Sequence, residues 1–345
     1  MTTDHAQPNA APPPHAQLIQ MASAYWVSKL IYAAAKLGLA DLLAGGARSA
    51  ADLAGPTRTH APSLHRLMRT LASLGVLTEG DGQRFALTPL GAALKSGAPG
   101  SALATVLTFG GPAMVGAFEQ ILHSLETGDT GFEKAMGLPI FDYFGAHPDE
   151  AALFSETMVG FHGAEPAAVA AAYDFSTFGT IVDVGGATGN MLAAILSRHA
   201  APHGVLFDLP HVVTGAPALL HAHGVDARVT ITSGSFFDGV PAGGDAYLLS
   251  HVIHDWNEAQ CLTILGHCRK AMPETGRLLL VEMVLPEGDA PHPGKILDMV
   301  MLVVPGGRER TAAEYAPLLH QAGFRIERVV PTESAVSVVE AVPIA

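Results

Sequence analysis

The chain has 345 residues, of which 49% are hydrophobic and 15% are charged, so it is not an intrinsically disordered protein. Its 32 acidic and 19 basic residues give a net charge of −13, which is atypical of proteins that bind nucleic acid or anionic lipid. The two cysteines, Cys261 and Cys268, are too few for a disulfide framework or a four-ligand zinc site. We therefore expect a globular, cytoplasmic protein with no nucleic-acid or membrane partner.

The N-terminal residues 1–14 are rich in Ala, Pro and Gln and have no basic segment followed by an apolar one. This composition predicts a disordered tail rather than an export signal. Elsewhere Gly, His, Asp or Pro interrupts every apolar stretch before the roughly 20 residues that a membrane-spanning helix needs. The remaining chain is expected to fold as a soluble enzyme.

Residues 15–100 are predicted to form a winged-helix domain. Apolar residues recur at helical spacing from 18 to 35, and two shorter helices follow at 50–54, capped by Ser49, and at 63–74. Residues 75–78 and 84–87 read as two strands joined by a Gly-Asp-Gly turn. Because the arginines at 58, 66 and 69 continue into no basic stripe, we expect the domain to serve packing and dimerisation rather than DNA binding.

Residues 101–172 are predicted to be helical, with interruptions at 110–112 and 137–139. The segment contains many Phe and Met residues. These side chains suit either an ordinary hydrophobic core or the wall of a pocket for a flat ligand. We treat the segment as a linker that covers the substrate.

Residues 173–345 alternate short β-rich runs with helical ones, which predicts an α/β domain with a doubly wound parallel sheet. In such a sheet, ligands bind beyond the carboxyl ends of the strands. The last two runs are separated by a short turn, so the sheet is expected to end in an antiparallel hairpin. The predicted strands are 181–184, 205–208, 229–233, 246–250, 277–283, 325–330 and 335–342.

The first two strands of this domain are followed by residues that suit a nucleoside. The turn after the first strand reads Asp183-x-Gly185-x-Ala187-x-Gly189, and it does not match the G-x-G-x-x-G pattern of dinucleotide sites. Asp208 ends the second strand, where a carboxylate can accept hydrogen bonds from a ribose diol. After the third strand, residues 234–238 offer an apolar face for an adenine ring. Because the loop lacks the glycine spacing that binds the pyrophosphate of a dinucleotide, the pattern favours S-adenosylmethionine (SAM) over NAD(P).

The candidate base is His254, which follows the fourth strand in the run His254-Asp255-Trp256. A histidine beside the cofactor cleft suits proton abstraction, because its ordinary pKa of about 6.5 is close to neutral pH. Two carboxylates are candidates to orient its ring: Glu282 at the end of the fifth strand, and Glu309 in the run Gly306-Gly307-Arg308-Glu309. Glu309 also suits a helix N-terminus paired with a neighbouring arginine.

This ordered set of motifs resembles the SAM-dependent O-methyltransferases of the plant caffeate and bacterial polyketide-tailoring type. The resemblance covers nearly the whole chain and includes the winged-helix start and the segment 297–311. It implies a homodimer with an N-terminal dimerisation domain and a C-terminal SAM domain. It also implies that His254 is the base, that Glu282 and Glu309 flank it, and that the cofactor lies at Asp183, Gly185, Asp208, Ser235, Phe236 and Ser250.

Two positions depart from the family pattern. Ala187 replaces the usual third glycine of the loop, which is tolerated if its φ is negative. Ser250 stands where many relatives carry Lys or Arg, so a side-chain contact from there to the methionine part of SAM is in doubt. No metal is expected, because the segment near Gly306 offers no further histidine to join His254 and Asp255.

The expected reaction is methyl transfer from SAM to a hydroxyl of a small aromatic secondary metabolite. The acceptor is expected to contact Met158, Phe161, His162, Met299 and Leu302. Alternatives are an N- or C-methyltransferase, a SAM-binding relative diverted to hydroxylation or pericyclic chemistry, an NAD-dependent oxidoreductase, and a winged-helix regulator. The sequence does not identify the acceptor.

Overall fold

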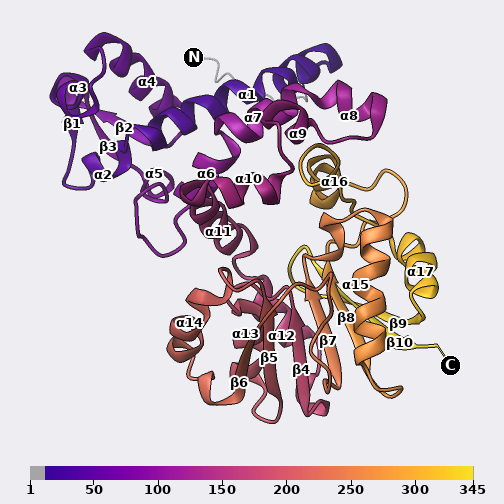
Figure 1. The fold of residues 1–345 in the computed structure, drawn as a ribbon. Helices are drawn as coiled ribbons and strands as arrows, with labels where there is room; N and C mark the ends of the chain where they lie inside the picture. Colours follow the sequence, from indigo (N-terminus) through magenta and orange to yellow (C-terminus); the bar gives the residue numbers. More distant parts are fainter. Residues whose placement is uncertain (1–11, 345) are drawn as a thin grey trace, which may run out of the picture. The chain divides into compact units, whose positions relative to one another are not determined.

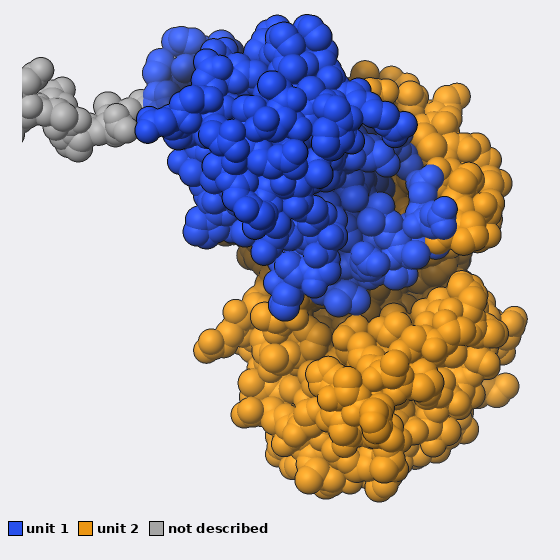
Figure 2. Space-filling view, turned by 90° about the vertical axis from the view of Figure 1, so that its left-hand side faces the viewer, with its two compact units in different colours: residues 1–115, 149–160 blue, residues 116–148, 161–345 orange. Residues whose placement is uncertain are grey.

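The structure is a computed structural model that describes residues 12–344 (Figure 1). The chain divides into two compact units: a first unit of residues 1–115 and 149–160, and a second unit of residues 116–148 and 161–345 (Figure 2). The helical segment expected at 101–172 is thus shared between both. Of the tail expected at 1–14, residues 1–11 lie outside the described residues, and Pro14 already begins the first helix.

The first unit contains the predicted winged helix. Strands β2 and β3 form the predicted hairpin, and a short strand that the sequence did not suggest, β1, pairs with β3 to give the order β1-β3-β2. Ser49 caps α3 in a capping box with Asp52, as its position predicted. The elements are α1 (Pro14–Lys36), α2 (Leu39–Leu43), β1 (Arg48–Ser49), α3 (Ala50–Thr57), α4 (Ala61–Ser73), β2 (Leu77–Gly80), β3 (Arg84–Leu87), α5 (Pro89–Ala92) and α6 (Leu103–Phe109).

Helices connect the winged helix to the sheet domain. Two of them cross the division between the units: α7 (Pro112–Glu119) and α11 (Pro148–His162). Short helices follow one another in the first part of the second unit. They are α8 (Ile121–Thr127), α9 (Gly131–Met136) and α10 (Ile140–Ala146). Gly128 and Gly137 end α8 and α9 with positive φ, which glycine adopts without strain.

The second unit is built on a seven-stranded sheet in the order β6-β5-β4-β7-β8-β10-β9. The strands from β4 to β8 pair in parallel, whereas β10 runs antiparallel to both β8 and β9. This arrangement confirms the predicted doubly wound sheet and its terminal hairpin. The strands are β4 (Thr180–Val184), β5 (His203–Asp208), β6 (Val229–Ser233), β7 (Ala246–Ser250), β8 (Arg277–Glu282), β9 (Phe324–Pro331) and β10 (Ser337–Pro343).

Helices cover both faces of the sheet. Leu248 packs into a core with α12 (Glu165–Ala172), α13 (Asn190–Arg198) and α14 (Ala216–Ala222), while its neighbour Leu249 packs into a core with α15 (Glu258–Ala271) and α17 (Ala312–Gln321). This alternation follows from the two-residue period of a strand. A further helix, α16 (Pro293–Val303), precedes the loop that carries Glu309. Within residues 12–344, no helix is long and apolar enough to cross a membrane.

Candidate active site

The glycine-rich loop after β4 follows a path that needs glycine at two positions. Gly185 and Gly189 have φ of 72° and 89°, in the left-handed region. A Cβ on Gly185 would lie 2.9 Å from Val252 Cγ2 and 3.4 Å from the ring of Phe236. Gly185 N–H donates to Phe207 O on the neighbouring strand at 2.8 Å. The loop is therefore held flat against the end of the sheet, with Phe236 beside it.

Ala187 adopts φ of 51°, so the negative φ at which its methyl group was expected to be tolerated is not the one observed. A left-handed conformation costs an alanine roughly 1–2 kcal/mol. What fixes this conformation is a hydrogen bond from Ala187 N–H to Asp208 Oδ2, 2.9 Å long. The loop therefore accepts strain at Ala187.

The two aspartates of this region lie in different environments. Asp208 accepts hydrogen bonds from Ala187 N–H and Leu209 N–H, and burial raises its pKa. Asp183 is fully buried beneath the loop, where a Cβ on Gly186 would lie 2.6 Å from the Asp183 carboxyl group. Burial and the nearby charge of Asp208 raise the pKa of Asp183 to about 7. Asp208 thus lies at the surface of the site, whereas Asp183 supports the loop from below.

The remaining residues predicted for the cofactor lie at the ends of β6 and β7. Ser235 Oγ accepts a hydrogen bond from Phe237 N–H at 3.2 Å, which shapes the turn that carries Phe236. Ser250 ends β7 and is half-buried. An open glycine loop, a strand-end carboxylate and an aromatic ring beside them fit a nucleoside with an adenine base and a ribose diol. The chain therefore has the groups that SAM requires.

The structure brings His254, Glu282 and Glu309 together. His254 lies in a short 3-10 helix after β7 (Ile253–Asp255), and its Nδ1 is 2.6 Å from Glu309 Oε1 and 3.5 Å from Glu282 Oε2. Glu282 Oε1 accepts a hydrogen bond from Ile253 N–H at 3.0 Å. Glu309 therefore orients the imidazole ring, while Glu282 holds the backbone of the turn.

Burial controls the charges of this cluster. It lowers the pKa of His254, raises the pKa of Glu309 to about 7, and raises that of Glu282 well above its ordinary value. Two carboxylates so close together do not both ionise. Because Glu309 contacts the ring N–H and Glu282 is more deeply buried, we assign the negative charge to Glu309. His254 is then a neutral imidazole with Nδ1 protonated, and Nε2, which lies 3.5 Å from Asp255 Oδ1, is the nitrogen that can accept a proton.

The loop 306–311 packs directly on the His254 turn. A Cβ on Gly307 would lie 1.8 Å from His254 O, so only glycine fits there. Arg308 N–H donates to His254 O at 2.7 Å, and Glu309 N–H donates to Asp298 Oδ1 at 2.9 Å. Of the two arginines beside Glu309, Arg308 pairs with Glu314, and Arg310 donates to Ile253 O and Arg308 O. The alternative pairing of Glu309 with a neighbouring arginine is therefore not the one observed. Asp298, which the sequence analysis did not select, lies 11 residues before Glu309 and fixes its backbone.

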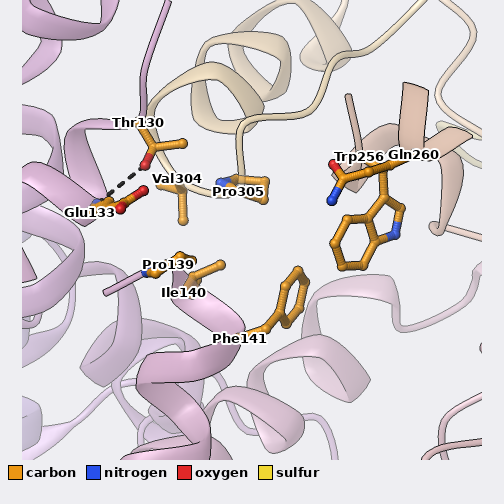
Figure 3. A pocket seen from close by; sticks show the side chains of 9 residues that line it. All are labelled: Thr130, Glu133, Pro139, Ile140, Phe141, Trp256, Gln260, Val304 and Pro305. Atoms are coloured by element: carbon orange, nitrogen blue, oxygen red, sulfur yellow. Dashed lines mark hydrogen bonds between the residues drawn. The ribbon is translucent and has the colours of Figure 1, made fainter. Parts of the chain in front are cut away.

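A cavity of about 210 Å³ lies beside Trp256, next in the chain to the His254 turn. Figure 3 shows Phe141 and Trp256 next to one another at one side of it, with Thr130 and Glu133 at the other. The rings of Phe141 and Trp256 stack with centroids 5.2 Å apart. Phe141, which the sequence analysis did not select, comes from α10. The cavity therefore has an aromatic wall within the second unit.

The residues predicted for the acceptor are distributed over both units. Met299 and Leu302 are half-buried on α16, and Phe161 and His162 end α11; all four belong to the second unit. Met158 belongs to the first unit. Their contact with an acceptor remains a prediction.

A second histidine cluster lies next to His254. Glu165 Oε2 is 2.8 Å from His251 Nε2 and 3.0 Å from His162 Nδ1, and the His251 and His254 ring centroids are 5.2 Å apart. Only His162 was selected from the sequence. Two sequence features could have identified the others: His251 stands three residues before the candidate base, and Glu165 stands three residues after His162. Two overlapping sets, His162–Glu165–His251 and His251–His254–Glu282, bring donor atoms close enough to hold a metal ion.

Comparisons with known proteins identify the family of the chain. Residues 19–97 match the O-methyltransferase dimerisation domain, and residues 118–325 match the O-methyltransferase domain. The chain is 45% identical to phenazine O-methyltransferase PhzM of Lysobacter antibioticus, over 95% of this chain and 96% of that protein. The crystal structure of LaPhzM matches with a TM-score of 0.91 at 44% identity, over 96% of this chain and all of that one.

A relative of different acceptor chemistry is also similar. The 8-amino-8-demethylriboflavin N,N-dimethyltransferase of Streptomyces davaonensis is 35% identical over 91% of each chain. The family match covers more than half of the chain, and the most extensive similarities span almost all of it. The chain belongs to the SAM-dependent O-methyltransferase family that carries an N-terminal dimerisation domain.

Proposed function

We propose that the chain transfers a methyl group from SAM to a hydroxyl of a small aromatic secondary metabolite, with His254 as the general base. The buried pair of His254 and Glu309 carries this proposal. It leaves Nε2 of a neutral imidazole free to accept the hydroxyl proton, which typically accelerates a reaction by about 10²–10⁴-fold. SAM, when bound, supplies an electrophilic methyl group on a sulfonium.

The chain's own groups would bind and orient the reactants. The loop at Gly185 and the carboxylate of Asp208 would hold the nucleoside, supported from below by Asp183. The ring of Phe236 would lie against the adenine, while Ser235 shapes its turn and Ser250 lies at the strand end beside it. Glu309 would stabilise the imidazolium that forms when His254 takes up the proton. The proposal needs no metal.

The aromatic class of the acceptor is supported by the flexible and flat side chains at the positions predicted to contact it. We assign acceptor contacts to Met158, Phe161, His162, Met299 and Leu302, and add Phe141 because it walls the cavity beside Trp256. PhzM is named for phenazine O-methylation, which is consistent with a polycyclic acceptor. The riboflavin-related N,N-dimethyltransferase makes methylation at nitrogen the second candidate function.

We also propose a homodimer in the cytoplasm. The dimerisation-domain match includes most of α1, where five large apolar side chains are 60–73% exposed: Leu18, Ile19, Met21, Tyr25 and Trp26. A face of this kind is costly in a monomer. The free, buried thiols of Cys261 and Cys268 support a reducing compartment. Light scattering of the purified protein should give a mass near twice 35.7 kDa; a monomeric mass would contradict the dimer.

The deciding experiment is transfer of labelled methyl from SAM to a panel of phenolic, polycyclic and heteroaromatic acceptors. The product is analysed for the atom that carries the label. Label on an acceptor oxygen supports the proposal, and label on nitrogen selects the second candidate. If SAM binds but no acceptor is labelled across a broad panel, the proposed transfer is wrong and a diverted chemistry takes its place.

A further inference from the structure

Arg310 is a buried charge that the proposed mechanism does not use. It follows Glu309 in the chain, and only 5% of it is exposed. Its guanidinium donates to Ile253 O at 3.4 Å and to Arg308 O at 3.0 Å, and it lies 3.8 Å from Cys261 Sγ. Within residues 12–344, none of its hydrogen bonds reaches a carboxylate. An arginine stays charged at every pH at which proteins fold, so a buried one needs a negative charge nearby.

The turn that carries His254 is held through the peptide groups on both sides of Ile253. Ile253 N–H donates to Glu282 Oε1 at 3.0 Å, whereas Ile253 O accepts from Arg310 and lies 3.2 Å from the Cys261 thiol. Burial raises the pKa of Cys261 to about 11, so this thiol stays protonated and can donate. Ile253 is the residue directly before His254. Glu282 and Arg310 therefore fix the two neighbouring peptide groups from which the imidazole projects.

Glu282 and Glu309 are the carboxylates that can balance this charge, because they too are fully buried, at most 1% exposed. The guanidinium of Arg310 lies 5.8 Å from the centre of the Tyr315 ring. Burial raises the pKa of Tyr315 well above its ordinary value; Glu282 and Glu309 raise it further and Arg310 lowers it, so all three groups lie near one buried ring. Burial likewise raises the pKa of Glu309, and the charge of Arg310 is among those that oppose this shift. Charges interact over several ångströms where water is excluded.

Glu314 is the alternative counter-charge. The backbone hydrogen bond from Thr311 lowers its pKa most, and Arg310 contributes to the same shift. The Glu314 side chain is 38% exposed and pairs with Arg308, so water and a second cation already compensate its charge. The buried region therefore holds one positive charge, on Arg310, and one negative charge, on Glu309.

We propose that Arg310 is a positioning residue for the base: its guanidinium holds the Ile253 carbonyl, and its buried charge balances that of Glu309. The inference rests on the proposed function, in which His254, paired with Glu309, takes up the hydroxyl proton. Arg310 forms no bond to acceptor or cofactor and transfers no proton. Without its positive charge the pair would take up a proton from solvent more readily, and a pair that is already protonated cannot act as a base.

Other titratable groups face the pair of His254 and Glu309 from the elements packed around it. All of them are retained in the variants compared below, so a difference between variants reports the change at position 310. These groups are Glu165, Asp255, Glu282, Asp298, His162, His251, His292 and Tyr315.

The test follows the protonation of His254 by NMR in the full-length protein, labelled with carbon-13 at the histidine Cε1 atoms. The resonance of His254 is identified by its loss in His254→Gln. In Arg310→Met, which keeps a long side chain without the charge, the pH midpoint of His254 should rise by about one unit. In Arg310→Lys the charge remains, so the midpoint should stay at the wild-type value. The kcat of Arg310→Lys for labelled-methyl transfer should still fall about tenfold, because an ammonium does not reproduce the hydrogen bonds of a planar guanidinium.

Arg228→Met is the matched control. Arg228 belongs to the same unit, and its guanidinium also donates to backbone carbonyls, to His199 O at 3.0 Å and to Pro202 O at 3.1 Å. These groups precede β5 and β6, at the end of the sheet opposite to His254. The control should lower the unfolding free energy but leave the His254 midpoint and kcat at their wild-type values.

The inference is overturned if Arg310→Met keeps the wild-type midpoint, if Arg310→Lys moves it as far as Arg310→Met does, or if Arg228→Met moves it too. Should Arg310→Met fail to fold, as judged by circular dichroism, Arg310→Lys decides alone, and a shifted midpoint or an unchanged kcat overturns the inference. Because the NMR midpoint needs no acceptor, the two proposals fail separately. A shifted midpoint in Arg310→Met without methyl transfer by the wild type contradicts only the proposed function, whereas methyl transfer with an unshifted midpoint contradicts only the role of Arg310.

Discussion

The carboxyl edge of the sheet is built by two different means at its two candidate sites. At the nucleoside end, after β4 and β5, backbone conformation dominates: Gly185, Ala187 and Gly189 all have positive φ. At the chemical end, after β7 and β8, buried titratable side chains dominate: His254, Glu282 and Glu309 are each at most 5% exposed. The first arrangement shapes a glycine-rich loop beside a strand-end carboxylate, and the second sets proton affinities.

This difference separates the expected consequences of mutation. Changes at the chemical end should affect turnover or the pH dependence of the unfolding free energy. Changes at the nucleoside end should affect cofactor affinity. Asp183 and Gly307 test the limits of this separation. Asp183 is a buried titratable group at the nucleoside end, and Gly307 is a backbone requirement at the chemical end.

The largest effect is expected from His254→Ala. Loss of the base should lower kcat by about 10²–10⁴-fold, because the hydroxyl proton has no acceptor in line with Glu309. SAM affinity, measured by calorimetry, should be unchanged, since His254 belongs to the chemical end. Turnover near that of the wild type would show that His254 is not the base. A parallel loss of SAM affinity would show that the chemical end also contributes to cofactor binding.

Gly307→Ala should be the most damaging of the backbone changes. The new Cβ would overlap His254 O and the backbone of Asp255, so the turn must move, at an expected cost of about 1–3 kcal/mol in unfolding free energy. Turnover should fall with it, because Glu309 follows Gly307 by two residues. The matched control is Gly266→Ala on α15, whose Cβ would meet nothing within 4 Å. If both variants unfold at the same urea concentration, the close packing at Gly307 is unimportant.

Asp208→Asn should weaken SAM binding by about 10–100-fold, the effect of losing a charge-assisted hydrogen bond. Asparagine keeps one oxygen to accept from the loop, so folding is expected to survive. At saturating SAM, kcat should be close to that of the wild type, in contrast to His254→Ala. A variant that binds SAM normally would show that Asp208 does not contact the cofactor.

The pH dependence of stability should reveal Asp183. Its pKa is raised from the ordinary 3.8 to about 7 in the folded protein, so the folded state binds more protons than the unfolded state between these values. The contribution of Asp183 to the unfolding free energy should therefore fall as pH rises from about 4 to about 7, by about 1.4 kcal/mol for each unit of pKa difference. Glu309 and Asp255, whose pKa values are raised to about 7 and about 6, add slope of the same sign. His251 and His254, whose pKa values burial lowers, contribute a slope of the opposite sign, so the Asp183 contribution is measured as the difference between the wild type and a variant without this carboxyl group.

Asp183→Asn tests this assignment, because asparagine has no proton to lose. Urea unfolding of the variant between pH 4 and pH 8 should show a shallower decline than the wild type. Glu165, with its pKa lowered to about 2, loses its contribution only as pH falls below 4.5, so it affects only the lowest end of this window. An unchanged slope in the variant would mean that Asp183 titrates normally.

The smallest effect is expected from Ala187→Gly. Glycine adopts the observed φ of 51° without strain but loses more conformational entropy on folding, so the net gain in unfolding free energy should be below about 1 kcal/mol. SAM affinity should be unchanged or slightly improved, because the hydrogen bond to Asp208 uses the backbone. Destabilisation of the variant would show that the alanine methyl group contributes packing that outweighs its strain.

Much of the fold was predictable from local patterns. Strand periodicity predicted all seven strands of the large sheet and its antiparallel end, and Ser49 was correctly identified as a helix cap. The strand β1 was missed because two residues carry no periodicity. The sign of φ at Ala187 was also unpredictable, since it follows from a hydrogen bond to Asp208, which lies 21 residues further along the chain.

The residues of the candidate chemistry were recognisable by type and position, because His254, Glu282 and Glu309 each follow a strand or a glycine pair. Their division of labour was not. Which glutamate orients the ring and which holds the turn depends on distances of 2.6 Å and 3.5 Å across three chain segments. Sequence order supplied the candidates, and tertiary packing decided their charges, because burial is what shifts their pKa values.

The histidine cluster of His162, Glu165 and His251 could not be predicted from the sequence. Nothing local to Glu165, at the start of α12, or to His251, after β7, indicates that they meet, since 86 residues separate them. By itself, the sequence determined the order of the elements, and it predicted the nucleoside loop and the candidate base. Only the tertiary structure decided which nitrogen of His251 carries a proton, because that depends on the Glu165 carboxylate at the start of α12, which lies 2.8 Å from His251 Nε2.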